Sequence, residues 1–369
     1  MKAVENAKSL KGKRVLLRAD LNTENLKDSY KVHRAINTIK FLVRKGAIVI
    51  VASHKGKPHG KRVEKESLKS TASALRKLLK KPVQFLPEWD FAELEVAIKR
   101  GRPGKIFLLE NLRFNRGEEE NDHTFAHRLA GLADMYVNDA FASCHRAHAS
   151  VEAITNYLPS YAGLLLMEEV ENLSKVMKSP KKPFTLILGG GKAADKFAVI
   201  EKLYPKVNKI LVGGVLANTF LFAAGQNVGQ SVVDESLLHH IKPWLKKKKI
   251  VLPVDFEFGP HGKIYDLGRK ARQEFLQIIR KSQTVVWNGP VGYFEQQEFR
   301  KGSEMIARAI TKKGIYSVVG GGETGTLIEE MNKQNSVSFL STGGGAMLAF
   351  LAGKKMPGID ALRRKKYIS

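Results

Sequence analysis

The strongest constraint on the fold is a repeated alternation of short apolar runs with stretches of helical periodicity. Runs such as AIVIVA, FTLIL and TVVW contain no polar residue except threonine, which is typical of strands buried on both faces of a parallel sheet. Alternation of this kind predicts an α/β fold with helices packed on the sheets. Because 369 residues are enough for two domains of ordinary size, we expect two such sheets.

The residues that follow each apolar run are informative, because open parallel sheets bind ligands beyond the carboxyl ends of their strands. In the first half these residues are polar and mostly cationic: Arg18, Asp20, Asn22, His54, Lys55, Lys57, Glu110, Asn111, Arg113, Asn138, Asp139, His145, Arg146 and His148. In the second half they are glycine clusters at 189–191, 213–214, 320–322 and 343–345, with Asn288, Gly289 and Pro290 after a further run.

The two kinds of strand end predict two different binding surfaces. Charged side chains would form a basic cup, and the glycines would form a floor of backbone N–H groups suited to a nucleotide. Glycines acting only as turns would explain one or two clusters, but not four at corresponding strand ends. A small anion held against a phosphate chain is the arrangement that phosphoryl transfer needs, because its catalysis is mainly positioning and charge stabilisation.

The stretch LILGGGKAADKF raises the same possibility on a smaller scale. Lys192 and Lys196 lie four residues apart, which predicts a shared face in the first turn of a helix. Cations oppose the helix dipole there, so a bound phosphate chain would explain them; solvated lysines after a glycine turn are the alternative. The stretch does not match GxxxxGK[ST], which excludes the usual P-loop.

The formal net charge of +26 invites a nucleic-acid interpretation. The lysines are scattered along the sequence, however, and the densest run, Lys246–Lys249, is predicted to be a solvated turn before the strand IVLPVDF. We find no zinc-ligand spacing and no RNA-binding aromatic motif, so nucleic acid is not expected as a partner. A single cysteine, Cys144, no membrane-length apolar run and no signal-peptide core at the start predict a cytoplasmic protein.

Three other clusters have plainer interpretations. His145 and His148 could ligate a metal, but no cysteine or carboxylate completes the set, so anion contact or packing is preferred. Cys144 is expected to be a packed side chain rather than a nucleophile. The acidic run Glu118–Glu120 is expected to be a solvated loop.

Eight longer motifs together resemble the phosphoglycerate kinase family along nearly the whole chain: RADLN, SHKGKP, LLENLRFNRGEEEND, VNDAFASCHRAHAS, ILGGGKAADK, VVWNGPVGYFE, GGGET and STGGGA. The resemblance implies a glycolytic enzyme that transfers a phosphoryl group between 1,3-bisphosphoglycerate and Mg-ADP. It implies two Rossmann-like three-layer domains with parallel sheets: 1–160, binding 3-phosphoglycerate, and 181–348, binding the nucleotide. A hinge helix at 161–180 would join them, and 349–369 would pack back on the first domain. A monomer with only small-molecule partners, using Mg²⁺ and ATP or ADP, is expected.

Carried over motif by motif, the resemblance also implies roles for individual residues. The substrate-binding set would be Asp20, Leu21, Asn22, Lys31, His54, Lys55, Gly56, Lys57, Arg113 and Arg146. The nucleotide-binding set would be Gly190, Gly191, Lys192, Lys196, Asn288, Pro290, Glu295, Gly321, Gly322, Glu323 and Thr324. Catalysis would involve Lys31, Lys192 and Gly344, with Gly343 beside the last, and Glu323 would hold the metal.

Three positions depart from the family pattern. Lys31 and Lys57 stand where the family has arginine, and Glu323 stands where it has aspartate. Lysine lacks the planar fork that makes bidentate contacts, and glutamate reaches one methylene further towards an ion that tolerates little distortion. A slower chemical step is therefore expected, unless Arg34, on the same predicted helical face as Lys31, takes the missing role. The alternative, motivated by these three substitutions and the net charge of +26, is a catalytically weakened homologue that acts as a basic nucleic-acid-binding protein.

Overall fold

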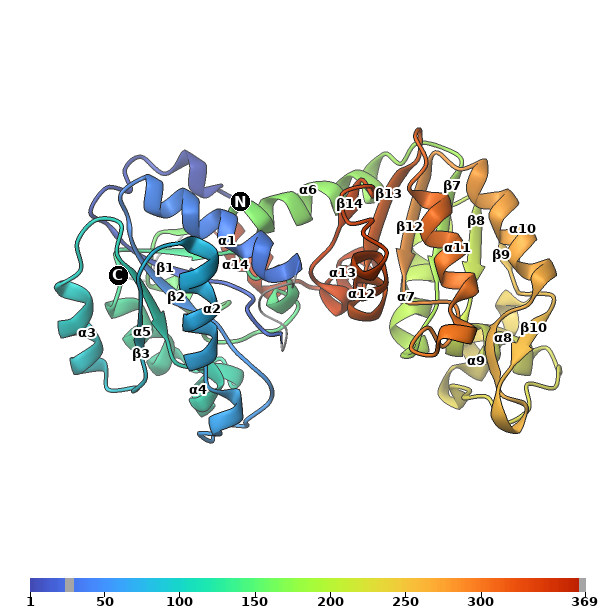
Figure 1. Cartoon of the computed structure of the whole chain (residues 1–369), viewed down its shortest axis with the longest axis horizontal. Helices are drawn as coiled ribbons and strands as arrows, with labels where there is room; N and C mark the ends of the chain where they lie inside the picture. The colour runs from blue at the N-terminus through green and yellow to red at the C-terminus, as the bar shows by residue number, and fades with distance from the viewer. Residues whose placement is uncertain (24–29, 365–369) are drawn as a thin grey trace. The chain divides into compact units, whose positions relative to one another are not determined.

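The computed structural model describes residues 1–23 and 30–364, and its contacts divide the chain into two units (Figure 1). Unit 1 comprises residues 1–170 and 355–369, and unit 2 comprises residues 171–354. The α/β class with two parallel sheets is confirmed. The predicted domain boundaries after residues 160, 180 and 348 stay predictions.

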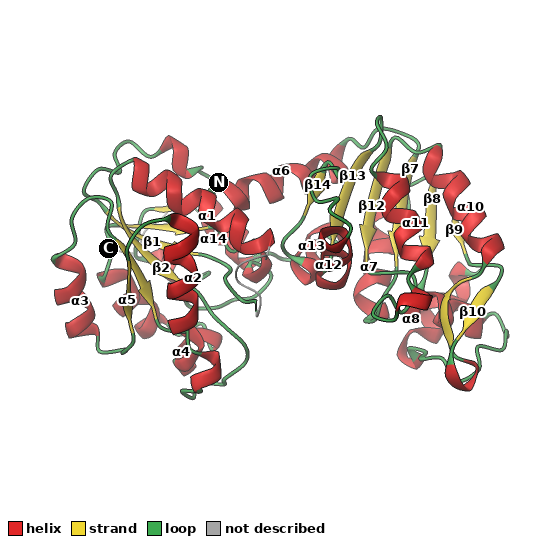
Figure 2. Ribbon diagram, viewed as in Figure 1, coloured by secondary structure: helices red, strands yellow, loops and turns green. Residues whose placement is uncertain are grey.

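Unit 1 is built on a six-stranded parallel sheet in the order β3-β4-β2-β1-β5-β6 (Figure 2). In chain order the strands are β1 (Arg14–Arg18), β2 (Ile48–Ala52), β3 (Val83–Leu86), β4 (Ile106–Leu109), β5 (Met135–Asn138) and β6 (Ser160–Ala162). Its helices are α1 (Tyr30–Arg44), α2 (Lys69–Leu79), α3 (Phe91–Lys99), α4 (Arg116–Glu119), α5 (His123–Gly131) and α14 (Pro357–Arg363).

The apolar pattern of the sequence explains how these elements pack. In α1, Val32, Ile36 and Ile39 recur at helical spacing and are buried. They belong to the same core cluster as alternate residues of the central strands, including Val15 and Val49. Burial of such side chains contributes roughly 1.5–3 kcal/mol each to folding, which holds α1 on the sheet.

Unit 2 contains a second six-stranded parallel sheet, in the order β14-β13-β12-β7-β8-β9. In chain order its strands are β7 (Phe184–Leu188), β8 (Lys209–Val212), β9 (Ile250–Val251), β12 (Thr284–Asn288), β13 (Tyr316–Gly320) and β14 (Phe339–Leu340). Figure 1 shows helices on both faces of this sheet. The helices are α7 (Ala193–Leu203), α8 (Gly214–Ala223), α9 (Leu238–Ile241), α10 (Arg269–Arg280), α11 (Lys301–Ile310), α12 (Gly322–Glu330) and α13 (Gly344–Leu351).

One predicted strand of unit 2 is wrong in extent. The run IVLPVDF was expected to be a single strand, but only Ile250 and Val251 join the sheet as β9. Phe256 begins a separate strand, β10 (Phe256–Phe258), which pairs antiparallel with β11 (Ile264–Leu267). Pro253 lies between the two segments, and a proline cannot donate to a strand ladder.

The connecting helix α6 runs from Leu164 to Lys178, which confirms the prediction of one helix that ends before Pro180. Asp139 lies just beyond β5, and its carboxylate accepts a hydrogen bond from the N–H of Leu166 in the first turn of α6 (3.1 Å). This bond satisfies one of the N–H groups that a helix start leaves unpaired. Complete burial raises the pKa of Asp139 to about 6.

Within residues 1–23 and 30–364, no helix is both long and apolar enough to cross a membrane.

Candidate active site

The carboxyl edge of the unit 1 sheet gathers the charged residues that the sequence singled out. Asp20 follows β1, His54 follows β2, and Arg113 lies in a short 3-10 helix after β4. Since β4, β2, β1 and β5 are parallel neighbours, their carboxyl ends lie side by side. The side chains of Asp20, His54 and Arg113 are each at most 5% exposed, so the sheet holds them in place rather than leaving them in solvent.

A buried arginine lies at the centre of this edge. The guanidinium of Arg18 donates to Ser150 Oγ (2.9 Å) and to the carbonyl oxygen of Ala19 (2.7 Å), and it lies 3.0 Å from Nδ1 of His54. Ser150 Oγ in turn donates to Glu118 Oε1 (2.7 Å), and the N–H of Ser150 donates to Glu118 Oε2 (2.9 Å). The chain Arg18–Ser150–Glu118 is fully buried, so its geometry is fixed by hydrogen bonds that water cannot replace.

The prediction for Glu118 is therefore wrong. It was expected to belong to a solvated acidic loop, but the side chain is buried at the start of α4 and faces Ser150 and His148. Its neighbours Glu119 and Glu120 remain partly exposed. From three adjacent glutamates the sequence cannot tell which side chain is buried. That depends on the position of Ser150 and Arg18, which are distant in the sequence.

Cations converge on His54. Burial lowers the pKa of His54 well below its usual value, and the positive charges of Arg18, Arg113 and Arg146 lower it further. The same causes lower the pKa of His148 to about 3. Burial also lowers the pKa of Arg113, with Arg146 and Arg18 adding to the effect and Glu119 opposing it. Such mutual repulsion favours the binding of an anion, which would offset the surrounding positive charge.

The segment Lys55–Lys57 is tied to the same edge through Gly56. Arg113 donates to the carbonyl oxygen of Gly56 (2.6 Å), and the N–H of Gly56 donates to Asn22 Oδ1 (3.1 Å). Gly56 has φ +61°, and a Cβ there would overlap the carboxylate of Glu66, so glycine is needed at this position. Leu21 is held by a bond from its N–H to Ser53 Oγ (3.0 Å). The predicted residues Asn22, Gly56 and Arg113 are thus linked by direct hydrogen bonds, and Leu21 is fixed beside them through Ser53.

Lys31 and Arg34 differ in what they contact. The ammonium of Lys31 lies 4.0 Å from Asp20 Oδ2. The guanidinium of Arg34 forms an ion pair with Glu168 on α6 and lies over the ring of Tyr30. The geometry thus favours Lys31 as the cation available to a ligand beside Asp20.

The carboxyl edge of the unit 2 sheet is lined by backbone. A Cβ at Gly189 would overlap the carbonyl oxygen of Pro290, and one at Gly289 would overlap the carbonyl oxygen of Gly189. The ends of β7 and β12 therefore pack backbone to backbone, which only glycine permits. The N–H of Gly190 donates to Pro290 O, so in this arrangement that predicted phosphate donor is already used. A Cβ at Gly191 would meet nothing within 4 Å, so this glycine borders open space.

The two lysines of the glycine motif do not share a helical face, contrary to the prediction. Helix α7 begins at Ala193, and Lys192 precedes it in a left-handed conformation with φ +51°. Lys192 is exposed, whereas Lys196 is only 5% exposed and its ammonium contacts the carbonyl oxygen of Gly191. Burial lowers the pKa of Lys196 to about 8, although Glu323 and Asp195 partly oppose the shift.

Three other predicted nucleotide residues meet at the ends of β12 and β13. Thr324 Oγ1 accepts a hydrogen bond from the N–H of Gly289 (2.8 Å). Asn288 is buried, its Nδ2 has no hydrogen-bond partner in the described structure, and a Cβ at Gly321 would lie 3.4 Å from that nitrogen. A buried amide without a partner is unfavourable by about 1–3 kcal/mol, which a ligand oxygen could offset.

The remaining predicted residues lie on the same edge. Gly322 and Glu323 form the exposed first turn of α12, Gly343 and Gly344 stand at the start of α13, and Glu295 is exposed in the loop after β12. A Cβ at Gly344 would lie 2.9 Å from Cα of Gly321, so these two glycine clusters are neighbours. A helix N-terminus presents free N–H groups and a positive dipole end, both suited to phosphate.

Glu323 is the residue predicted to hold the metal ion. Among the described residues, no three histidine, cysteine or acidic side chains gather closely enough to hold a metal ion. Mg²⁺ is commonly held by one or two carboxylates together with substrate phosphates, so a lone carboxylate beside a phosphate site fits this ion. Glu323 meets this description, because a Cβ at Gly190 would lie 3.2 Å from its Oε2.

Comparison with known proteins identifies the family of the chain. A family profile described as Phosphoglycerate kinase matches residues 4–354. The chain belongs to the phosphoglycerate kinase family. It is 40% identical over 379 residues to the phosphoglycerate kinase of Coprothermobacter proteolyticus, with 96% of each chain covered. It is 41% identical over 390 residues to that of Thermosipho africanus, with 97% of each chain covered.

Solved structures of the phosphoglycerate kinase family share the fold. The phosphoglycerate kinase from Coxiella burnetii superposes with a TM-score of 0.83 at 35% identity, and that from Pyrococcus horikoshii OT3 with a TM-score of 0.87 at 28% identity. In both cases 98% of each chain is covered.

Two residues of the unit 1 edge were not predicted as site residues. Arg18 was noted only as a strand end, and Ser150 was not singled out. The available signal was Arg18 itself, since a charged residue at the end of an otherwise apolar central strand needs a buried partner. Ser150 carried no comparable signal, because a serine after SCHRAHA is equally compatible with a turn.

Proposed function

We propose that the unit 1 edge binds the glycerate substrate and the unit 2 edge binds the nucleotide in the reaction of phosphoglycerate kinase. Membership of the family makes the chain a phosphotransferase with a carboxyl group as acceptor. The observation that carries the assignment of substrates to edges is the convergence of Arg18, Arg113 and Arg146 on His54, which leaves an excess of positive charge for a small anion to neutralise.

In the unit 1 pocket, His54, Arg113 and Arg146 hold the phosphate and carboxylate of 3-phosphoglycerate. Asp20 and Asn22 bind its glycerate end, with Leu21 and the segment Lys55–Lys57 completing the wall. The buried guanidinium of Arg18 acts through His54, because it lies 3.0 Å from Nδ1 and orients the ring. Lys31, beside Asp20, contributes charge close to the carboxyl group that reacts.

In unit 2, Lys196, Thr324 and the helix starts at Gly322 and Gly344 line the nucleotide phosphates. Asn288, Pro290 and Gly321 border the nucleotide, and Glu295 takes the ribose hydroxyls. Lys192 is exposed at this edge. Its left-handed backbone conformation places it before α7 rather than on a face of that helix. It is the cation best placed to follow the phosphoryl group and to offset its developing charge.

The chemical step moves one phosphoryl group. A terminal oxygen of the ADP β-phosphate attacks the phosphorus of the acyl phosphate, and the bond between that phosphorus and the carboxyl oxygen breaks. The products are ATP and 3-phosphoglycerate, whose new carboxylate keeps the electron pair. Charge spreads over the transferring oxygens during this step, so the backbone N–H groups near Gly344 and the ammoniums of Lys31 and Lys192 stabilise it.

Mg²⁺ would be held by Glu323 together with the nucleotide phosphates, and it would neutralise part of their charge. We further propose a cytoplasmic monomer that works by hinge bending, since both substrates must meet with water excluded.

Two measurements test these assignments. Purified protein should form ATP from Mg-ADP and 1,3-bisphosphoglycerate in a coupled assay. In an NMR titration, 3-phosphoglycerate should raise the pKa of His54, because the anion offsets the surrounding cations. A matched control is Arg62→Gln, which removes an exposed arginine paired with Glu88 and should change neither result. ATP formation without any shift at His54 would contradict the placement of the substrate.

A further inference from the structure

Positively charged residues precede five neighbouring strands at the amino edge of the unit 2 sheet, opposite the edge described above. They come from the end of α6 and from the loops before β7, β8, β9, β12 and β13. We call this set the amino-edge surface: Lys175, Lys178, Lys181, Lys182, Lys206, Lys209, Lys246, Lys247, Lys248, Lys249, Arg280, Lys281, Lys312 and Lys313. All are at least partly exposed.

Backbone hydrogen bonds place these loops side by side in the order of the strands. The N–H of Tyr316 donates to Gln283 O, and the N–H of Gln283 donates to Pro183 O, both at 2.8 Å. On the other side, the N–H of Asn208 donates to Phe184 O and the N–H of Ile210 donates to Lys249 O, again at 2.8 Å. With neighbouring strands about 4.8 Å apart, five strands give a basic strip about 19 Å long.

The cations of this strip do not form direct ion pairs with carboxylates. In the part of the chain that the structure describes, none of its fourteen cations forms an ion pair. Elsewhere in unit 2, Arg272, Arg300 and Lys354 do pair with carboxylates. Three of the ammoniums, those of Lys206, Lys209 and Lys249, contact backbone carbonyl oxygens, which leave their charge in place. A row of like charges of this length repels itself, and a linear polyanion would neutralise several of them at once.

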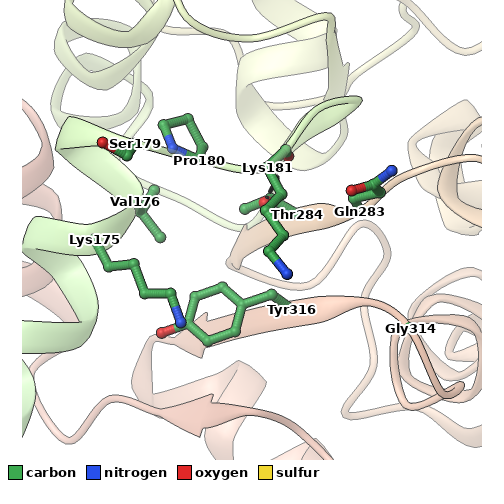
Figure 3. Close-up of a pocket in the computed structure, with 9 residues that line it drawn as sticks. All are labelled: Lys175, Val176, Ser179, Pro180, Lys181, Gln283, Thr284, Gly314 and Tyr316. Atoms are coloured by element: carbon green, nitrogen blue, oxygen red, sulfur yellow. Dashed lines mark hydrogen bonds between the residues drawn. The ribbon is translucent and has the colours of Figure 1, made fainter.

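Aromatic rings lie between the lysines. At the β13 end of the strip a hollow of about 90 Å³ is lined by Lys175, Lys181 and Tyr316 among others (Figure 3). Figure 3 shows both lysine side chains reaching towards the tyrosine ring, and Lys175 Nζ lies 4.1 Å from its centroid. The hydroxyl of Tyr316 donates to Asn172 Oδ1 (2.6 Å), which anchors the ring.

Two more aromatic rings, which pack against each other, lie at the β8–β9 end of the strip. Tyr204 and Trp244 meet edge to face with centroids 5.1 Å apart, and both rings are partly exposed. Lys249 Nζ lies 4.8 Å from the centroid of the Tyr204 ring, and Lys247 lies near both rings. Basic residues interleaved with accessible aromatic rings are what single-stranded nucleic acids bind, through phosphate contacts and base stacking.

We propose that the amino-edge surface binds single-stranded nucleic acid, independently of the active site at the opposite edge of the sheet. An anionic membrane is less well matched, because peripheral binding also uses apolar side chains that insert. The large apolar side chains that the structure describes as exposed in unit 2 are Phe222, Val232, Val254, Phe258 and Tyr293, and none belongs to these loops. The sequence did not reveal this surface, since its residues come from six separate segments.

The test uses the full chain and a labelled single-stranded RNA of mixed sequence, with binding followed by fluorescence anisotropy over a range of salt. The variant replaces Lys181, Lys182, Lys312 and Lys313 with glutamine. The matched control replaces Lys65, Lys69, Lys77 and Lys80 of unit 1, which are also exposed, so that the net charge falls equally. The slope of log K against log salt is negative, and each lost phosphate contact should make it shallower by about 0.7. Because four lysines are replaced, the slope of the variant should be shallower than that of the wild type by up to about 2.8.

We expect the variant to bind RNA at least tenfold more weakly than the wild type at 50 mM salt, with the control close to the wild type and with kcat unchanged in both. Equal losses in variant and control would mean that only net charge matters, and would overturn the proposal. Unchanged binding by the variant would overturn it too. So would wild-type protein that binds vesicles containing phosphatidylserine but not RNA.

Discussion

Replacing Lys196 with methionine should make the unliganded protein more stable and its nucleotide binding weaker. The side chain is 5% exposed and its pKa falls from 10.5 to about 8, mainly because burial disfavours the ammonium. At roughly 1.36 kcal/mol per pH unit, the difference between these two pKa values corresponds to about 3.4 kcal/mol. Methionine also loses the contact of the ammonium with Gly191 O, worth about 1 kcal/mol, so a net gain of about 2 kcal/mol is expected at pH 7.

The pH dependence of this gain follows from the direction of the shift. Below about pH 8 the lysine is protonated in both states, and the folded state carries the full cost of the buried charge. Between about pH 8 and 10.5 the folded protein releases the proton while the unfolded chain keeps it, so the wild type gains stability as pH rises. The advantage of Lys196→Met should therefore disappear by about pH 10.5.

Urea denaturation of both proteins at pH 7 and at pH 10 measures this difference directly. Lys202→Met is a suitable control, because Lys202 lies on the same helix but is exposed. Titration with ADP in the same buffers should show weaker binding by Lys196→Met. If Lys196→Met is less stable than the wild type at pH 7, or if its stability difference is the same at both pH values, the ammonium is not desolvated and the reasoning fails.

Three further predictions concern the two edges. Lys31→Arg should raise kcat roughly fivefold, or by about 1 kcal/mol, because arginine supplies a bidentate fork; an unchanged or lower kcat in the coupled assay would count against it. Glu118→Ala should cost about 3–5 kcal/mol in urea denaturation because it leaves buried donors unpaired, whereas Glu120→Ala should cost less than about 1 kcal/mol; similar losses would show that Glu118 is not a buried anchor. Gly191→Ala should keep the stability and raise the KM for ADP, whereas Gly189→Ala should lose about 1–3 kcal/mol or more; an unchanged KM would place the phosphates away from Gly191.

The sequence alone was sufficient to predict the two parallel sheets and the kinds of residue at their carboxyl edges. Uninterrupted apolar runs identify buried strands, and the residue after each run identifies what the edge presents, as with Asp20, His54 and the glycines at 189–191. It was not sufficient where a side chain's direction depends on distant partners. Glu118 turns inward because Ser150, itself bonded to Arg18, donates two hydrogen bonds to it. Lys192 lies outside α7 because its backbone is in the left-handed conformation.

The scattered lysines show the same limit on a larger scale. In the sequence, Lys181, Lys281 and Lys312 lie up to about 130 residues apart and suggest only a general basicity. The parallel sheet brings the start of every strand to one edge, so residues distant in the chain become neighbours. No local sequence motif predicts this surface, because its residues become neighbours only through the order of the strands in the sheet.

The backbone contact between Gly189 and Gly289 has a consequence for how this enzyme can diverge. At these two positions almost any mutation adds atoms where the opposing main chain already lies, so neither can be varied to adjust affinity. Gly191, two residues further on, has room to accept a side chain. If the proposed nucleotide site lies at this edge, a side chain that changes nucleotide affinity can be added at Gly191 but not at Gly189 or Gly289.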